Sequence, residues 1–244
     1  MRPPRRAFSM VELLVVMVVF AVLATIMLPV LGRVRKAGVE AAASANIRSH
    51  AAIMLVYTGD WRGTFPYFTD PRRQTTPLQC GERIVQAAYF DAVYLWPCAL
   101  APGYYENKPS HPSFKAPGHI TGDNPYKYSL SMIAHPDFWH PGTRRGPSQW
   151  LPTNIADVRY TELKGMLVSW ANAYTRPGAL DFTQPRLRFE VGFCDGSSAS
   201  VRYTDFVPPV PNGTGPVGPD PTSTFGQPVI HTLYGVRGRD LLRR

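Results

Sequence analysis

The sequence predicts an α+β fold in which one long N-terminal helix, with a membrane half and an amphipathic half, packs on a small antiparallel sheet with long Pro-rich loops. Three features predict it: an apolar run near the N-terminus, apolar residues three and four apart directly after it, and short alternating segments in the second half of the chain. With 244 residues, 44% of them hydrophobic, the chain is long enough for one folded domain plus an appendage. Its 25 prolines are about twice average usage, which favours long connections.

The apolar run covers residues 8–31 and contains a single charge, Glu12. At about 1.5 Å per residue such a helix exceeds the roughly 30 Å of the hydrocarbon layer of a bilayer. A basic leader, residues 1–7, precedes it, so an ordinary signal peptide cleaved before Thr25 is the alternative to an anchor. A carboxylate in hydrocarbon costs on the order of a few kcal/mol, which suggests that Glu12 has a specific partner.

The stretch RRAFSMVELLVVMVVFAVLATIMLPVL resembles the class III signal of type IV pilins and type II secretion pseudopilins. The shared pattern is a basic leader, a small residue, an aromatic residue, a glutamate five residues into the mature helix and a later proline. The resemblance implies that a prepilin peptidase cleaves between Ala7 and Phe8 and that Phe8 is then N-methylated. Ala7 stands where the family usually has glycine.

The same resemblance implies a structural subunit that is stored in the bacterial inner membrane, crosses it once, and assembles into a type IV pilus or type II secretion-like filament. The leader would be cytoplasmic and the head periplasmic or extracellular. The expected partners are copies of the chain, other pilin-like subunits, prepilin peptidase, an inner-membrane assembly platform and the lipid bilayer. The alternative is an exported or membrane-anchored binding protein or enzyme with an ordinary signal sequence.

Two residues of the helix receive roles from this resemblance. Cleavage before Phe8 creates an ammonium group one helical turn from Glu12, and an opposite charge makes a carboxylate tolerable in low dielectric. In the family that amine belongs to a neighbouring subunit, so Glu12 would set the register of assembly; a carboxylate lying at the lipid headgroups is the simpler alternative. Pro29 matches the proline of the family's helix and should kink or locally open it.

Residues 32–58 continue the helix with an apolar stripe, because apolar residues recur at spacings of three and four. We expect this stripe to pack on the head and the helix to stop at Gly59. The domains expected are a cleaved leader at 1–7, the hydrophobic helix at 8–31, its amphipathic continuation at 32–58, an α+β head at 59–206, and a Pro-rich C-terminal segment and tail at 207–244. The stripe consists of Val34, Val39, Ala42, Ala43, Asn46, Ile47, His50, Ile53, Met54 and Tyr57.

The sheet of the head is expected from alternating segments at 126–134, 164–174, 186–193 and 199–203. Asp195 and Gly196 between the last two are typical of a hairpin turn. The phrase FCDGSSASVRY is similar to a hairpin near the end of many pseudopilin-like proteins.

The three cysteines would face an oxidising compartment if the head is exported. Cys80 and Cys98 are the favoured disulfide, which leaves Cys194 unpaired; three buried thiols are the alternative. The sequence contains no P-loop, no Gly-x-Ser-x-Gly elbow, no His-Glu-x-x-His and no dinucleotide fingerprint, so we predict a protein that is not an enzyme.

We expect no cofactor and no metal. Some pseudopilins bind calcium, and Asp181, Asp195 and Asp205 are weak candidates, but they lack the dense Asp and Asn spacing of a calcium loop. The histidines of the proline-rich stretch, at 111, 119, 135 and 140, match no closed metal pattern. The net charge of +9 is scattered rather than gathered in a stripe, so no specific nucleic acid is predicted.

Overall fold

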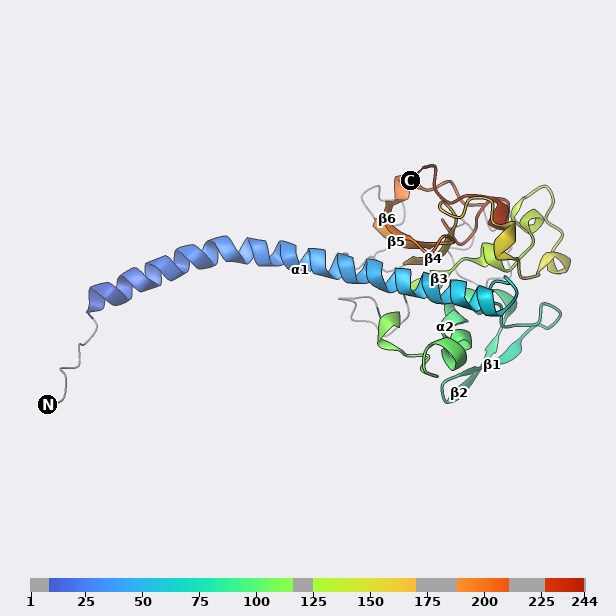
Figure 1. The fold of residues 1–244 in the computed structure, drawn as a ribbon, viewed down its shortest axis with the longest axis horizontal. Coiled ribbons are helices and arrows are strands. Elements are labelled where there is room, and N and C mark those ends of the chain that lie inside the picture. Colours follow the sequence, from blue (N-terminus) through green and yellow to red (C-terminus); the bar gives the residue numbers. More distant parts are fainter. Residues whose placement is uncertain (1–8, 116–124, 170–187, 211–226, 244) are drawn as a thin grey trace. The chain divides into compact units, whose positions relative to one another are not determined.

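The computed structural model describes residues 9–115, 125–169, 188–210 and 227–243. The chain divides into two compact units, Met1–Ala41 and Ala42–Arg244. The first unit is the N-terminal part of helix α1, and the second holds the rest of that helix and the head (Figure 1).

Helix α1 runs from Met10 to Asp60, which confirms the prediction of one long N-terminal helix. It ends slightly beyond the expected stop at Gly59, in a turn where the Gly63 N–H donates to the Thr58 carbonyl at 2.6 Å. Gly63 has φ +81°, and a Cβ there would lie 2.6 Å from the side chain of Asn154. The left-handed C′ residue of this cap is Arg62, at φ +54°, and the positive φ and close approach at Gly63 account for glycine at position 63.

The apolar stripe of α1 is confirmed from Ala43 onward, where it packs into the head. Val34, at the start of the predicted stripe, is 62% exposed. The buried residues of the helix are Ala43, Ile47, His50, Ala51, Met54, Tyr57 and Thr58.

The main sheet is four-stranded and antiparallel, in the order β3-β4-β5-β6. Strand β3 is Tyr126–Tyr128, β4 is Gly165–Ser169, β5 is Arg188–Phe193 and β6 is Ser198–Arg202. The predicted antiparallel sheet is therefore confirmed, and the Asp195-Gly196 turn joins β5 to β6 with Gly196 at φ +80°. The predicted residues 170–174 and 186–187 lie outside the described part of the chain.

The strand predicted at 126–134 is wrong beyond Tyr128, because the chain turns there into the 3-10 helix Leu130–Met132. The residues from Tyr126 to Ala134 are all buried, so the alternation of residue types does not separate a core face from a solvent face. Ser129 and Ser131 instead place their hydroxyls 2.5 Å apart in the interior.

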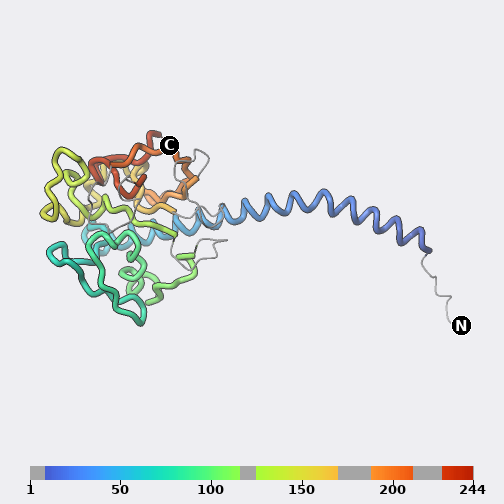
Figure 2. Tube along the Cα trace, turned by 180° about the vertical axis from the view of Figure 1, so that it is seen from behind, coloured from blue at the N-terminus to red at the C-terminus, as the bar shows by residue number. Residues whose placement is uncertain are grey.

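Helix α1 lies close against the sheet at Gly192 of β5. A Cβ at that position would meet the Ala51 Cβ at 3.0 Å and the Ile47 carbonyl oxygen at 3.2 Å. The absence of a side chain at 192 and the small one at 51 together permit this contact. In Figures 1 and 2 the strands of the sheet lie along one side of α1, and α2 with the small hairpin lies along the other.

Two elements were not predicted. A two-stranded hairpin consists of β1, Thr76–Cys80, and β2, Arg83–Ala87. Helix α2, Ala92–Tyr104, follows it and contains Pro97 and Pro102 in its interior. The rest of the described head is mostly short 3-10 turns.

The C-terminal segment expected at 207–244 is described at 207–210 and 227–243, and much of the second range is part of the core. Val229, Ile230, Val236 and Leu241 are at most 2% exposed. This segment also supplies Asp240, whose carboxylate lies 2.7 Å from the Lys164 ammonium, and both side chains are buried.

This ion pair is the centre of a buried polar network. The Asp240 carboxylate also accepts hydrogen bonds from the Gly165 N–H at 2.8 Å and from the Thr232 hydroxyl at 2.5 Å. Lys164 donates further to Thr232 at 2.6 Å. Since a buried ion pair is tolerable only when its remaining hydrogen-bonding groups are satisfied, the network fixes the C-terminal segment in one position.

Candidate functional site

The first unit presents an unusually apolar surface. Its large apolar side chains from Met10 to Val34 are between 51% and 90% exposed. A window of this helix has a mean hydropathy of 2.9, and by length and composition the helix is able to cross a membrane. In the described part of the chain α1 is the one helix with this property. Such a surface is stable only in lipid or against other apolar surfaces.

The start of this helix is a capping box formed by Ser9 and Glu12. The Glu12 N–H donates to the Ser9 hydroxyl oxygen at 3.2 Å. In return, the Ser9 N–H and hydroxyl donate to the Glu12 carboxylate at 2.8 and 3.0 Å. The carboxylate thus satisfies a backbone donor at the helix N-terminus and lies where the helix dipole favours negative charge.

Sequence reasoning missed this local role of Glu12, although a Ser-x-x-Glu pattern before an apolar run was a visible signal. The role in assembly that the sequence suggested for Glu12 needs a second subunit and stays a prediction. Ala7 and Phe8, the predicted cleavage site, lie outside the described residues. Phe8 immediately precedes Ser9, so an amine created there would lie next to the capping box in sequence.

Pro29 lies inside α1 without ending it. Proline has no N–H, so the carbonyl of Thr25 loses its usual helical donor. The Thr25 hydroxyl donates one turn back to the Ala21 carbonyl at 2.7 Å. The helix continues through this turn in the single chain, and the kink or local opening expected at Pro29 stays a prediction. This turn is therefore one backbone hydrogen bond short, and its part in assembly stays a prediction.

The end of α1 in the head is held by a buried histidine, His50. Its Nδ1 lies 2.8 Å from the Tyr105 hydroxyl, and its Nε2 lies 2.9 Å from the Ser113 carbonyl oxygen. The carbonyl can only accept, so Nε2 carries the proton and Nδ1 accepts from Tyr105. Its ring stacks on Phe114 at 5.2 Å and is enclosed by further aromatic side chains. Burial lowers the pKa of His50 to about 4, partly opposed by the hydrogen bond to Ser113.

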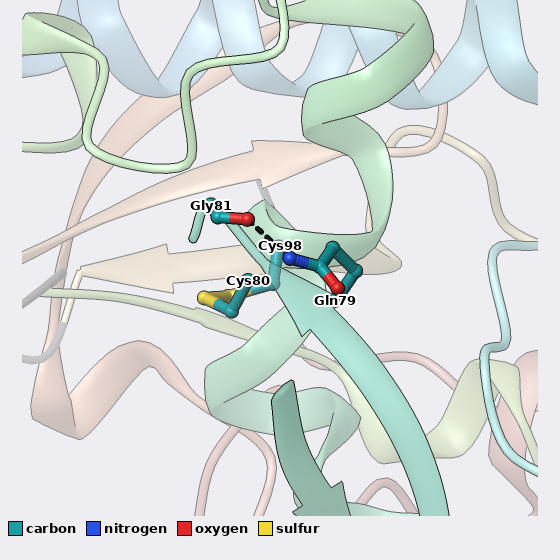
Figure 3. Close-up of a disulfide and its surroundings, with 4 residues drawn as sticks. All are labelled: Gln79, Cys80, Gly81 and Cys98. Atoms are coloured by element: carbon teal, nitrogen blue, oxygen red, sulfur yellow. Dashed lines mark hydrogen bonds between the residues drawn. A yellow bond between two sulfur atoms is a disulfide. The ribbon is translucent and has the colours of Figure 1, made fainter. Parts of the chain in front are cut away.

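Cys80 and Cys98 are joined in a disulfide that links strand β1 to helix α2 (Figure 3). Their Cα atoms are 4.7 Å apart. Next to the bridge the Gln79 side-chain amide donates to the Gly81 carbonyl at 2.5 Å. Cys194 is free and buried, and burial raises the pKa of its thiol. The cysteine side chains therefore serve structure rather than exposed thiol chemistry.

The calcium candidates are not brought together by the described residues. Asp195 accepts a hydrogen bond from the Ser197 N–H at 2.9 Å, in the hairpin turn. Asp205 lies in the short 3-10 helix after β6, and Asp181 lies outside the described residues. Across the described ranges no group of three His, Cys, Asp or Glu side chains could hold a metal.

The histidines of the proline-rich stretch also have local partners. Nδ1 of His111 lies 2.7 Å from the Ser113 hydroxyl, and the ring of His140 stacks on Tyr234 at 5.0 Å. His135 lies 3.4 Å from the Asp137 carboxylate. His119 lies outside the described residues.

Comparison with known proteins identifies one feature of the chain. Residues 2–28 match the prokaryotic N-terminal methylation motif, the signature of type IV pilin and pseudopilin precursors. No curated protein and no solved structure matches the chain. The motif therefore confirms the resemblance drawn from the sequence, and with the apolar helix it indicates membrane anchoring in bacteria and processing of the prepilin type.

Proposed function

We propose that this chain is a pilin-like or pseudopilin-like structural subunit, stored in the bacterial inner membrane and assembled into a type IV pilus or type II secretion-like filament. One observation carries the proposal. The methylation motif at residues 2–28 lies on a helix that continues without a break into a folded head. A chain built in this way can exchange a lipid environment for the apolar helices of its neighbours without refolding its head.

In the proposed processing step a prepilin peptidase cleaves between Ala7 and Phe8, and Phe8 is then N-methylated. The new ammonium group lies about one helical turn from Glu12 along its own chain. In a filament the amine of one subunit pairs with the Glu12 carboxylate of another, and this pair sets the register of the two helices. The support for this step is the position of Glu12 within the matched motif, together with the cost that an unpaired carboxylate would have in the low dielectric of a bilayer.

The proposed topology is a single pass with the leader in the cytoplasm and the head in the periplasm or outside the cell. The Cys80–Cys98 disulfide supports an exported head, because disulfides persist in oxidising compartments. The distribution of basic residues does not decide the orientation in the membrane, because the leader has three arginines and the other side of the apolar segment has Arg33, Arg35 and Lys36.

The proposed partners are copies of this chain, other pilin-like subunits and an inner-membrane assembly platform. The exposed apolar side chains from Met10 to Val34 support contacts with other helices of the same kind. Since the side chains are apolar all around this segment, several neighbours can pack on it at once.

The second candidate is an exported or anchored binding protein or enzyme whose N-terminus is an ordinary signal. Cleavage near Thr25 would cut α1 in the middle of a continuous helix. Intact mass measurement and N-terminal sequencing of the protein from membranes decide between the two. A start at methylated Phe8 supports the filament subunit, and a start near Thr25 refutes it.

The cleavage site has a matched pair of variants. Ala7→Phe places a bulky side chain where the motif has a small one, so the full precursor should accumulate. Ala7→Gly keeps a small residue and should be processed normally. Normal mature mass for Ala7→Phe would contradict cleavage at this bond.

A further inference from the structure

A loop of the head, residues 135–151 (yellow-green to yellow in Figure 1), contributes the residues that line a surface hollow of about 470 Å³. This volume lies within the range of about 300–1,000 Å³ that is usual for small-molecule sites. Six of the seven lining residues carry polar groups on their side chains, and Leu151 is the one apolar residue among them. None of these residues belongs to the methylation motif or to the apolar helix.

The loop is built to hold its shape, because its backbone and its amide side chain bond to each other. The His135 N–H donates to the Gln149 carbonyl at 2.8 Å, which closes the loop. The Gln149 side chain accepts from the Arg145 N–H at 2.6 Å and donates to the Thr143 carbonyl at 3.0 Å. Thr143 in turn donates its hydroxyl to the Asp137 carbonyl at 2.8 Å. The wall of the hollow is therefore preorganised.

Four other side chains of the lining have hydrogen-bonding groups that could bind a ligand. The Asp137 N–H donates to Nδ1 of His135 at 3.3 Å, so the imidazole carries its proton on Nε2, which is available as a donor. The Asp137 carboxylate lies 3.4 Å from the same ring and is half exposed. In the part of the chain that the structure describes, the Arg145 guanidinium and the Ser148 hydroxyl have no hydrogen-bond partner within the protein.

The chemistry of these groups selects the kind of ligand. The lining carries one guanidinium and one carboxylate, so its formal charge is about zero and it has no excess charge to select an anion or a cation. A neutral ligand needs no such excess. A single apolar residue, Leu151, 55% exposed, offers too little surface for an apolar peptide or a lipid chain.

We propose that this hollow binds a neutral saccharide. The Asp137 carboxylate accepts protons from sugar hydroxyls, while Arg145, Ser148 and His135 donate to sugar oxygens. Leu151 covers the apolar face of a sugar ring. The proposal stands independently of filament assembly, because all the groups involved lie in the head.

The test is calorimetric titration of the full-length protein in lipid nanodiscs with two probes, a glucose tetrasaccharide and an N-acetylglucosamine tetrasaccharide. Nanodiscs are needed because maltoside and glucoside detergents carry the proposed ligand. We expect saturable binding of at least one probe that does not change when salt is raised, since the ligand is uncharged. Arg145→Gln and Asp137→Asn should each weaken it about tenfold or more, because each removes a charged hydrogen-bonding group.

The matched control is Arg83→Gln, which removes an exposed arginine from strand β2 outside the loop and should leave binding unchanged. Thermal unfolding of each variant shows that the head is intact. Absence of binding by both probes at about 10 mM, a concentration far above the usual range of specific sites, would overturn the proposal. Unchanged binding in Arg145→Gln and Asp137→Asn, or displacement of the probe by the zwitterion glycylglycine, would overturn it as well.

Discussion

Replacing Glu12 by glutamine separates two roles of one carboxylate. In the single chain Glu12 accepts hydrogen bonds from the N–H and hydroxyl of Ser9 at 2.8 and 3.0 Å. Glutamine serves at this position of a capping box as well as glutamate does, through its amide oxygen. Glu12→Gln therefore retains the cap and removes the charge, whereas Ser9→Ala removes the cap and retains the charge.

The two variants should differ in size of effect. Loss of an N-cap costs about 1 kcal/mol of helix stability, which corresponds to roughly a fivefold change in an equilibrium. Loss of the charge leaves the amine of a neighbouring subunit unpaired in low dielectric, at about 3 kcal/mol or more per contact. At about 1.4 kcal/mol for each factor of ten, that is a loss of about 100-fold or more in assembly.

The assay is the yield of sheared filaments relative to mature subunit in the membrane fraction. Glu12→Gln should be inserted and processed like the wild type but should give almost no filaments. Ser9→Ala should give filaments within about fivefold of the wild-type yield. Filaments at normal yield from Glu12→Gln would refute the register role, and an equal or larger loss in Ser9→Ala would show that assembly depends on the cap at least as much as on the charge.

Three further predictions concern the head, each read from denaturant unfolding. The pKa of His50 is about 4 in the folded chain, whereas an unfolded chain binds this proton below a pH of about 6.5. The free energy of unfolding should therefore fall by about 2 kcal/mol from pH 7 to pH 5. His50→Gln should make the free energy of unfolding less dependent on pH over this range. Lys164→Met should cost about 3–5 kcal/mol by leaving the Asp240 carboxylate buried and unpaired, and adding Asp240→Leu should restore much of it; a double variant as weak as the single one would contradict the pairing. Cys80→Ser should lower the free energy of unfolding by about 3 kcal/mol, because it opens a loop closed by cysteines 18 positions apart. Reductant should then have no further effect on the stability of this variant. In the control Cys194→Ala, reductant should destabilise the head as it does in the wild type.

The parts of the fold that could be predicted are those with a local signal. The three-and-four spacing of α1 located the residues that contact the head, such as Ile47 and Met54, because a helix repeats every 3.6 residues. Asp195 and Gly196 located the hairpin, because glycine accepts the positive φ of the turn. The N-terminal motif could be predicted for the same reason, since all of its parts lie within one short stretch.

The parts that could not be predicted depend on partners distant in sequence. Proline is unfavourable inside a helix, as at Pro97 and Pro102, but burial of Trp96 and Leu100 and the bridge at Cys98 stabilise helix α2 against that preference. Hairpin β1–β2 left only a faint signal, a Gly-Glu turn between two short runs. Nothing near Lys164 in sequence indicates a carboxylate 76 residues away.

The two halves of α1 explain why one helix serves both a bilayer and a folded head. From Met10 to Leu31 the side chains are apolar on every side and exposed, so this half depends on whatever surrounds it. From Ala43 to Thr58 a single stripe is buried, and it is fixed by the close contact of Ala51 with Gly192 and by the hydrogen bonds of His50. Exchanging lipid for neighbouring helices therefore changes the surroundings of the first half only. In the proposed filament residues 8–31 supply the apolar helix contacts, so variants there should alter filament yield while leaving the unfolding transition of the head unchanged.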